Sequence, residues 1–324
     1  MYSAKTYDSA KHASKYAVNI PEVSFDLPKI IARKSKVVRK LVLGVKAKLT
    51  ANNVTIVSGE AQIIDKNTVR CGEEIYEGEN LILCTGSETF IPPIPGVDAV
   101  NYWTHRDALD SKELPASLAI VGGGVIGMEF ASFFNSLGVQ VAVVEMMDEI
   151  LGGMDKELSA LLRAEYAKRG IKFLLGTKVV GLSQTEEGAV VSYENAEGNG
   201  SVIAEKLLMS VGRRPVTKGF GLENLNLEKT ERGAVKVDEK MQTSVPGVYV
   251  CGDLTGFSLL AHTAVREAEV AVHSILGKED TMSYRAIPGV VYTNPEIAGV
   301  GETEESASAK GITCQVIKLP MTYS

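Results

Sequence analysis

Residues 117–145 read SLAIVGGGVIGMEFASFFNSLGVQVAVVE and decide the fold that we expect for the chain. The pattern predicts a buried strand over 118–121, a glycine-rich turn, a helix over about 125–136 and a second strand over 140–144. Gly122, Gly124 and Gly127 form G-x-G-x-x-G. The first glycine permits the tight turn, the second admits a pyrophosphate, and the third lets the helix pack on the strand. The phosphates would bind free N–H groups at the helix N-terminus.

An acid, Glu145, ends this stretch, about 20 residues after the glycines, where dinucleotide-binding folds place a ribose-binding carboxylate. A carboxylate there accepts hydrogen bonds from both ribose hydroxyls and repels a 2′-phosphate. No arginine follows it in Met146-Met147-Asp148. The sequence therefore favours NAD over NADP. The alternative is a structural turn in another α/β protein, and it is weaker because strand, helix and acid are all present.

Length and composition narrow the functional class. The chain has 324 residues, enough for two or three domains, and a net charge of −6, which argues against non-specific nucleic-acid binding. No apolar run reaches the roughly 18 residues of a membrane span, and the first residues lack the apolar core of a signal peptide. The four cysteines are widely spaced, so the sequence shows no metal site and no redox-active disulfide. We expect a cytoplasmic protein with reduced thiols.

The first fifty residues predict two helices. Residues 1–15 look helical without a preceding strand, which we interpret as a sign that a first βα unit lies upstream. Asp26 and Pro28 start the second helix as cap and first-turn residue, and apolar residues follow at helical spacing. Its interleaved lysines and arginines could form a nucleic-acid or membrane face. The simpler interpretation is the solvated side of an amphipathic helix.

Residues 54–87 change to strand patterns. Short segments, VTIVSGEAQIID, TVRC and EEIYEG, predict a small antiparallel meander, whereas the apolar run 81–84 predicts a buried parallel strand. That strand ends in Thr85-Gly86-Ser87. Three prolines, at 92, 93 and 95, then mark a domain boundary, since proline continues neither sheet nor helix.

After Glu145 the pattern predicts a helix over 155–169, strands from 172, a meander over 190–204 and a strand over 206–211. Gly212-Arg213-Arg214-Pro215 follows. A glycine at a strand's carboxyl end suits close approach to a ligand, although GRRP also reads as a plain turn with two solvated arginines.

The strand 247–253 ends on Asp253, and Leu259-Leu260-Ala261-His262 opens a helix that runs to about 276. The acid suits a chain of sugar-like hydroxyls, and the helix N-terminus would stabilise negative charge on a ring system. From Tyr284 we expect strand, turn and helix, then a strand over 314–319.

Five motifs follow one another in a fixed order: LILCTGS, VGGGVIGMEF with VVE, SVGRRP, GVYVCGD with LLAH, and VVYTNPEIAGVG. Because it carries these motifs, the chain resembles the flavin-dependent pyridine nucleotide–disulfide oxidoreductases. It is most similar to their dihydrolipoamide dehydrogenase branch. The resemblance implies an α/β protein with two Rossmann-like three-layer domains. An FAD domain, residues 1–98 and 223–284, would hold an inserted NAD domain, 99–222, and an α+β interface domain of a homodimer would start at 285–324.

The resemblance also implies the cofactor contacts. For NAD these are Gly122, Gly123, Gly124, Val125, Ile126, Gly127, Met128, Glu129, Glu145, Val179 and Gly212. For FAD they are Gly59, Thr85, Gly86, Ser87, Asp253, Leu259, Leu260, Ala261 and His262. His262 would act through its backbone, with a core or capping histidine as the alternative. The implied partner is a lipoyl-bearing protein of a 2-oxoacid dehydrogenase or glycine cleavage complex, with no nucleic acid or membrane.

The chain departs from the family in the parts that carry the thiol chemistry. It has no second G-x-G-x-x-G for FAD and no C-x-x-x-x-C, and none of His12, His105, His262 or His273 lies in the family's His–Glu motif. We therefore name no catalytic residue, expect an interior portion of the enzyme, and expect weak FAD retention and no lipoamide turnover. The alternatives are a sibling flavin reductase of another disulfide or a metal ion, and a non-catalytic nucleotide-binding protein.

Overall fold

A computed structural model describes residues 1–320, and internal packing divides the chain into two units. Unit 1 comprises Met1–Lys34, Ile91–Val211 and the segment from Arg285 onward. Unit 2 comprises Ser35–Phe90 and Gly212–Tyr284. One segment of unit 1 thus starts inside the proline-rich stretch. The domain limits given above stay predictions, because this division rests on packing alone.

Unit 1 is built on a parallel sheet of five strands in the order β6-β13-β7-β8-β9. The strands are β6 (Tyr102–Trp103), β13 (Lys206–Met209), β7 (Ser117–Val121), β8 (Gln140–Val144) and β9 (Lys172–Leu174). Helix α4 (Val125–Ser136) connects β7 to β8, and α5 (Lys156–Lys168) connects β8 to β9. The strand–helix–strand predicted from the opening stretch is confirmed.

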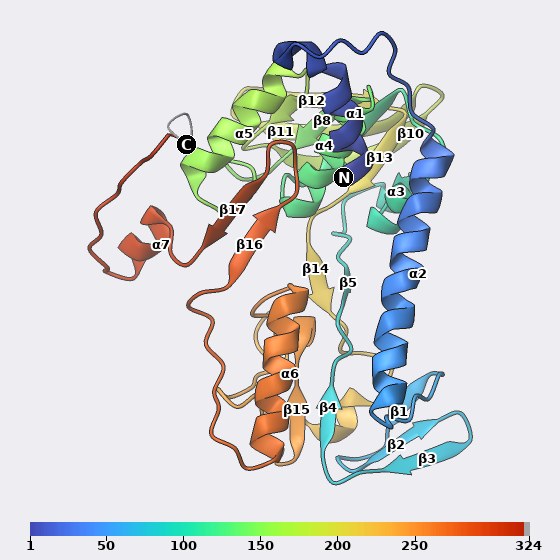
Figure 1. Cartoon of the computed structure of the whole chain (residues 1–324), viewed down its shortest axis with the longest axis vertical. Coiled ribbons are helices and arrows are strands. Elements are labelled where there is room, and N and C mark those ends of the chain that lie inside the picture. Colours follow the sequence, from blue (N-terminus) through green and yellow to red (C-terminus); the bar gives the residue numbers. More distant parts are fainter. Residues whose placement is uncertain (321–324) are drawn as a thin grey trace. The chain divides into compact units, whose positions relative to one another are not determined.

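The two faces of this sheet are covered differently, as alternation along β7 requires. Leu118 and Ile120 pack with α4 and α5 in one core cluster, and all of these are essentially fully buried. Ala119 and Val121 pack on the other face against an antiparallel meander. The meander consists of β10 (Lys178–Thr185), β11 (Gly188–Asn195) and β12 (Gly198–Ala204) (Figure 1). Helix, sheet and meander form three layers.

Two further parts of unit 1 pack against α4. Helix α1 (Tyr2–Lys11) lies against it through Ala4 and Leu137, and the hairpin of β16 (Pro288–Val291) and β17 (Ile297–Val300) contributes Val291 and Ile297 to its core cluster. The other elements of unit 1 are η1 (Ala13–Tyr16), η2 (Val97–Ala99), α3 (His105–Asp110) and α7 (Glu304–Ala309). The buried Tyr166 hydroxyl connects α4 to the hairpin, since it bonds with Ser132 Oγ and with the backbone of Asn294.

Unit 2 pairs strands from both of its segments. Strand β4 (Leu81–Leu83) lies parallel to β15 (Val248–Val250), and β5 (Ser87–Thr89) lies antiparallel to β14 (Arg213–Pro215). Helix α6 (Ala261–Ile275) packs beside β15 through Val270 and Ala271 (Figure 1). The other elements are β1 (Ala61–Ile63), β2 (Thr68–Cys71), β3 (Glu74–Glu77), η3 (Leu222–Leu225), η4 (Gly252–Thr255) and most of α2 (Leu27–Ala51). The predicted meander β1–β3 and the buried parallel strand β4 are confirmed.

Two strand predictions are wrong. Residues 54–58 and 314–319 form no strand, and neither segment pairs with a strand among the described residues. The alternative interpretation of GRRP as a plain turn is also wrong, because Arg213–Pro215 is a strand paired with β5. In α2, the predicted start is correct, since Asp26 accepts the Lys29 N–H at 2.9 Å. Its apolar side, however, is open: Val37 to Val45 include side chains 45–66% exposed, and Leu27 alone is buried. No helix among residues 1–320 is long and apolar enough to cross a membrane.

Candidate functional site

The glycine-rich turn of unit 1 is shaped by two glycines that leave no room for a side chain. Gly122 has φ +104°, and a Cβ there would lie 2.2 Å from the Ser210 carbonyl oxygen. A Cβ on Gly127 would lie 2.1 Å from the Gly122 carbonyl oxygen. Gly124 is different, because a Cβ there would meet no atom within 4 Å. The first and third glycines serve the fold, and the second leaves open space.

That open space adjoins the N-terminus of α4. Gly124 is the N-cap, and no side chain caps the helix. Val125 and Ile126 are 40% and 38% exposed, so the first turn faces solvent. Uncapped N–H groups at a helix N-terminus bind anions. The turn therefore offers a phosphate both room and donors, as the motif predicts.

Glu145 follows β8 at the same edge of the sheet, and two backbone N–H groups fix its carboxylate. Oε2 accepts from Gly123 N at 2.6 Å, and Oε1 accepts from Met147 N at 2.8 Å. Each carboxylate oxygen has a further lone pair, and the side chain is half-buried. The carboxylate is thus held beside the glycine turn with acceptor capacity left for the two hydroxyls of a ribose.

Four other predicted NAD contacts have different surroundings. Met128 is fully buried in the core, and its N–H bonds to the Gly124 carbonyl within the helix. The Glu129 carboxylate accepts the Tyr292 N–H at 2.9 Å. Val179 is half-buried in β10 beside a bulge. Gly212, with φ +110° and open space around it, belongs to unit 2. Contacts of these four residues with a nucleotide stay predictions.

In unit 2, three polar residues from three segments meet at the ends of β4 and β15. The Ser87 hydroxyl donates to Asp253 Oδ2. Arg213 Nε donates to Ser87 Oγ at 2.7 Å, and its terminal nitrogen donates to the Ser87 carbonyl at 2.6 Å. Arg213 therefore holds the serine that orients the acid. The second arginine, Arg214, makes only an exposed pair with Glu88.

The backbone beside this cluster is also fixed. Thr85 Oγ1 donates to the Val216 carbonyl at 3.0 Å, and Val216 N donates to the Gly86 carbonyl at 3.0 Å. Gly59 lies close to Cys71, whose sulfur would be 2.6 Å from a Cβ at that position. Thr85, Gly86 and Ser87 are thus brought together with Asp253. The structure shows no contact of Gly59 with the cluster.

Helix α6 starts without a side-chain cap at Leu260. Leu259, Ala261 and His262 are exposed, so the His262 ring is not a core residue. The N–H groups of the first turn are open at this end, which agrees with the expected backbone role of this segment.

Behind this turn lies a buried acid that the sequence analysis did not single out. Glu267 is 0% exposed, accepts the Gly252 N–H at 2.5 Å, and accepts the Tyr284 hydroxyl at 2.8 Å. Burial raises the pKa of Glu267 above its ordinary value, and the hydrogen bonds oppose that rise. Burial and the bond to Glu267 raise the pKa of Tyr284 in turn. Glu267 thus anchors the Gly252–Asp253 turn from beneath.

Sequence reasoning missed Arg213, Glu267 and the neighbouring positions of two of the four cysteines. Cys84 and Cys251 directly follow the last paired residues of β4 and β15, so the two cysteines are neighbours. The pairing of distant strands brings the two cysteines together and places Arg213 beside Ser87, whereas Glu267 meets Gly252 and Tyr284 through the packing of α6. The one available signal was Gly212-Arg213 at the end of a strand.

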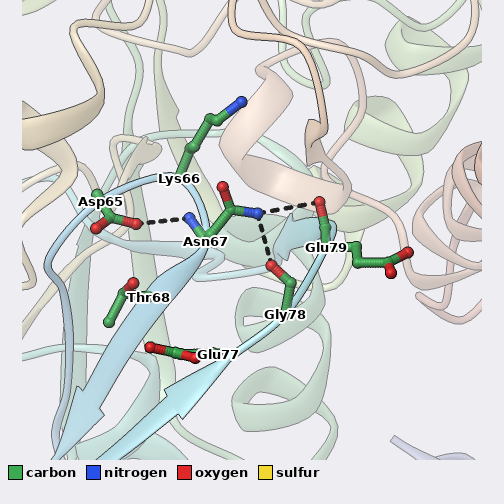
Figure 2. Close-up of a pocket in the computed structure, with 7 residues that line it drawn as sticks. All are labelled: Asp65, Lys66, Asn67, Thr68, Glu77, Gly78 and Glu79. Atoms are coloured by element: carbon green, nitrogen blue, oxygen red, sulfur yellow. Dashed lines mark hydrogen bonds between the residues drawn. The ribbon is translucent and has the colours of Figure 1, made fainter.

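A surface pocket in the β1–β3 meander is separate from the strand-end cluster. It is lined by Asp65, Lys66, Asn67, Thr68, Glu77, Gly78 and Glu79. Figure 2 shows the Asn67 side chain donating to the Gly78 and Glu79 carbonyls, at 2.6 and 3.2 Å. The lining is that of a turn whose polar groups bond to one another. Among residues 1–320, no group of three or more His, Cys, Asp or Glu is placed to hold a metal ion.

Comparison with known families identifies the family of the chain. Residues 2–268 match the model of the pyridine nucleotide-disulphide oxidoreductases, and residues 287–324 match the dimerisation domain of the same proteins. The chain belongs to the pyridine nucleotide-disulphide oxidoreductase family. Membership implies the use of FAD and of a pyridine nucleotide.

Curated relatives of this chain are dihydrolipoyl dehydrogenases. The Thermus scotoductus enzyme is 37% identical over 329 residues, 100% of this chain and 70% of that protein. The Geobacillus stearothermophilus enzyme is 35% identical, over 97% of this chain and 67% of that protein. Mitochondrial dihydrolipoyl dehydrogenase 1 of Arabidopsis thaliana is 34% identical, over 99% of this chain and 65% of that protein. The chain thus spans about two thirds of the length of these relatives.

Solved structures of flavoprotein disulfide reductases have a similar fold. LpdA from Mycobacterium tuberculosis superposes with a TM-score of 0.89 at 26% identity, over 99% of this chain and 71% of that one. The HOCl-induced flavoprotein disulfide reductase RclA from Escherichia coli, as its Cu(II) complex, superposes with a TM-score of 0.80 at 27% identity, over 93% and 68%. The predicted family and fold class are confirmed.

Proposed function

We propose that this chain belongs to an NAD-dependent dihydrolipoamide dehydrogenase, a flavoprotein that moves electrons from dihydrolipoyl groups through a disulfide and FAD to NAD. The curated relatives carry that activity in their names. A homodimer and a lipoyl-bearing partner protein of a 2-oxoacid dehydrogenase or glycine cleavage complex belong to the same proposal. The observation that carries the nucleotide part is the Glu145 carboxylate, held by Gly123 N and Met147 N beside the open turn at Gly124.

This arrangement supports NAD rather than NADP. A 2′-phosphate would place negative charge beside a carboxylate that backbone bonds hold in position. Two unit charges about 4 Å apart repel by about 4 kcal/mol at an effective dielectric constant near 20. No cation follows Glu145 within the next three residues to offset that repulsion. The two N–H bonds also prevent the side chain from swinging away.

The strand ends of unit 2 fit a flavin in the chemistry of their donor set. The Asp253 carboxylate, oriented by Ser87 and Arg213, suits the hydroxyls of a ribityl chain. The uncapped first turn of α6 offers N–H groups to the electron-rich edge of a ring. When bound, FAD supplies electron transfer between a dithiol and a nicotinamide. This chain's own contribution is to bind and orient the cofactor.

The proposal is tested first by nucleotide binding. We expect the purified chain to bind NADH at least tenfold more tightly than NADPH, measured by calorimetry or by nicotinamide fluorescence. Glu145→Gln keeps an acceptor oxygen for one N–H but removes the charge, so it should reduce the preference for NADH over NADPH. The matched control is Asp148→Asn, which removes the charge of a nearby exposed carboxylate that accepts no bond from the Gly123 or Met147 N–H groups. A tenfold preference for NADPH would overturn the assignment and favour a sibling reductase.

The lipoamide part needs a separate measurement. Since the sequence contains no C-x-x-x-x-C, we expect these 324 residues to show no dihydrolipoamide:NAD activity and little flavin absorbance after gel filtration. Turnover of lipoamide by this chain, or stoichiometric flavin, would contradict that expectation. NADH binding without turnover in the protein as the cell makes it would instead support the non-catalytic alternative.

A further inference from the structure

Two cysteines that are far apart in the sequence occupy neighbouring positions at the ends of β4 and β15. The last paired residues of these parallel strands are Leu83 and Val250, and Cys251 N donates to the Leu83 carbonyl at 3.1 Å. Cys84 and Cys251 are each the next residue along. Because side chains alternate along a strand, both thiols lie on the same face of the pair.

The two neighbouring cysteines differ in exposure. Cys251 is 2% exposed and packs with Tyr249, Val270 and Ala271 between β15 and α6. Cys84 is exposed and lies beside Cys251 at the neighbouring strand end. One sulfur is therefore open to a reagent, and its partner lies behind it.

The neighbouring position of the two thiols also favours reaction at the exposed sulfur. The Cys251 thiol lowers the pKa of Cys84 to about 7. The proximity of Cys84, together with burial, raises the pKa of Cys251. Glu267, the charged group that faces the pair from α6, opposes the lowering at Cys84 and adds to the rise at Cys251. Cys84 therefore ionises more readily than an ordinary thiol, and the thiolate is the form that attacks disulfides, while Cys251 keeps its proton.

The backbone spacing suits a covalent bond. Neighbouring strands lie about 4.8 Å apart, and the Cα atoms of a cystine are usually about 4.4–6.8 Å apart. A shared soft metal ion is the other common use of two thiols, but no third ligand of the usual kind joins them among residues 1–320. The arrangement favours a bond between the two sulfurs.

We propose that Cys84 and Cys251 are a reversible redox pair, which a low-molecular-weight disulfide oxidises to a cross-strand disulfide. The Cys84 thiolate attacks one sulfur of glutathione disulfide, forms a mixed disulfide and releases one glutathione thiolate. Cys251 gives its proton to that thiolate and attacks Cys84 Sγ, which releases the second glutathione. The two cysteines lose two electrons, and one glutathione disulfide becomes two glutathiones.

This pair is separate from the proposed nucleotide and lipoamide chemistry, since it needs neither cofactor. It lies directly before Thr85-Gly86-Ser87 on one strand and Gly252-Asp253 on the other. Oxidation would therefore tie together the two strand ends that carry the proposed flavin contacts. Reduction by excess dithiol would restore the free thiols.

The test uses the full chain, glutathione disulfide, an acid quench, alkylation with N-ethylmaleimide under denaturing conditions, and peptide mass spectrometry. A glutamate-specific protease cleaves at Glu77 and Glu79, between Cys71 and Cys84, so each cysteine is read separately. We expect a Cys84–Cys251 cross-linked peptide as the main oxidised product, with Cys71 and Cys314 alkylated. Cys251→Ala should stop at glutathionylated Cys84, and Cys84→Ser should give neither product.

Matched controls come from the other two cysteines. Cys71→Ser and Cys314→Ser should leave the yield of the cross-link within about twofold. The proposal is overturned if wild-type Cys84 stays glutathionylated while Cys251 remains a free thiol. It is equally overturned if Cys84 joins Cys71 or Cys314 instead, or if the chain unfolded in guanidinium gives the same cross-link in the same yield.

Discussion

The nucleotide turn of unit 1 and the strand ends of unit 2 both lie at the carboxyl ends of parallel strands, but the chain assembles them differently. The nucleotide turn uses one continuous stretch, 117–145, in which strand, turn, helix and acid follow in order. The unit 2 cluster takes Ser87, Arg213 and Asp253 from three distant segments. Local spacing therefore encodes the first site, whereas only strand pairing creates the second.

The largest expected effect concerns the local encoding of the nucleotide turn, which Gly127→Ala tests. In Gly127→Ala the new Cβ would lie 2.1 Å from the Gly122 carbonyl oxygen, which is backbone and cannot move aside cheaply. We expect a loss of about 3 kcal/mol or more in the free energy of unfolding, measured by urea titration, because overpacking forces the turn apart. NADH binding should fail as a consequence. A variant of normal stability would show that the turn is not determined by this local contact.

Substitution of the two arginines of unit 2 should lower the free energy of unfolding by different amounts, and both losses should be smaller than that of Gly127→Ala. Arg213→Ala removes two hydrogen bonds to Ser87 and leaves the Ser87–Asp253 contact without its support. We expect a loss of about 1.5–3 kcal/mol, the usual range for hydrogen bonds to charged groups. Arg214→Ala is the matched control, since its exposed pair with Glu88 should contribute less than about 1 kcal/mol. Equal losses in the two variants would contradict a special role of Arg213.

Gly124→Ala should weaken binding with little effect on stability. Its φ of −70° suits alanine, and no atom lies within 4 Å of the new Cβ. Alanine is a poorer N-cap than glycine by less than about 1 kcal/mol. The methyl group would occupy the space proposed for the pyrophosphate, so we expect NADH to bind at least tenfold more weakly. Unchanged NADH affinity would place the phosphates elsewhere.

The same contrast explains what the sequence could and could not predict. The elements of 117–145 match the structure within a residue, because apolar period, glycine spacing and the terminal acid are all local signals. The strand predicted over 314–319 failed, because a β-pattern becomes a strand only beside a partner. Arg213 looked like a solvated turn residue, because its partner Ser87 lies 126 positions away. Cysteine spacing likewise hid the proximity of Cys84 and Cys251.

The smallest expected effect concerns pH and the buried acid beneath the unit 2 turn. The pKa of Glu267 is raised in the folded protein, so the folded state binds this proton more tightly than the unfolded state. Stability therefore falls as the pH rises from the unfolded value of about 4.3 toward the raised folded value. Glu267→Gln removes the titration and keeps an acceptor for the Gly252 N–H. We expect the wild type to lose stability relative to this variant as the pH rises above about 4, measured by urea unfolding at each pH. Asp280, whose pKa is instead lowered by Arg266 and His273, gives the control of opposite sign. Parallel stability curves for the wild type and Glu267→Gln would mean that the carboxylate ionises as freely in the folded protein as in the unfolded chain, and Glu267 would then not anchor the turn as a buried acid.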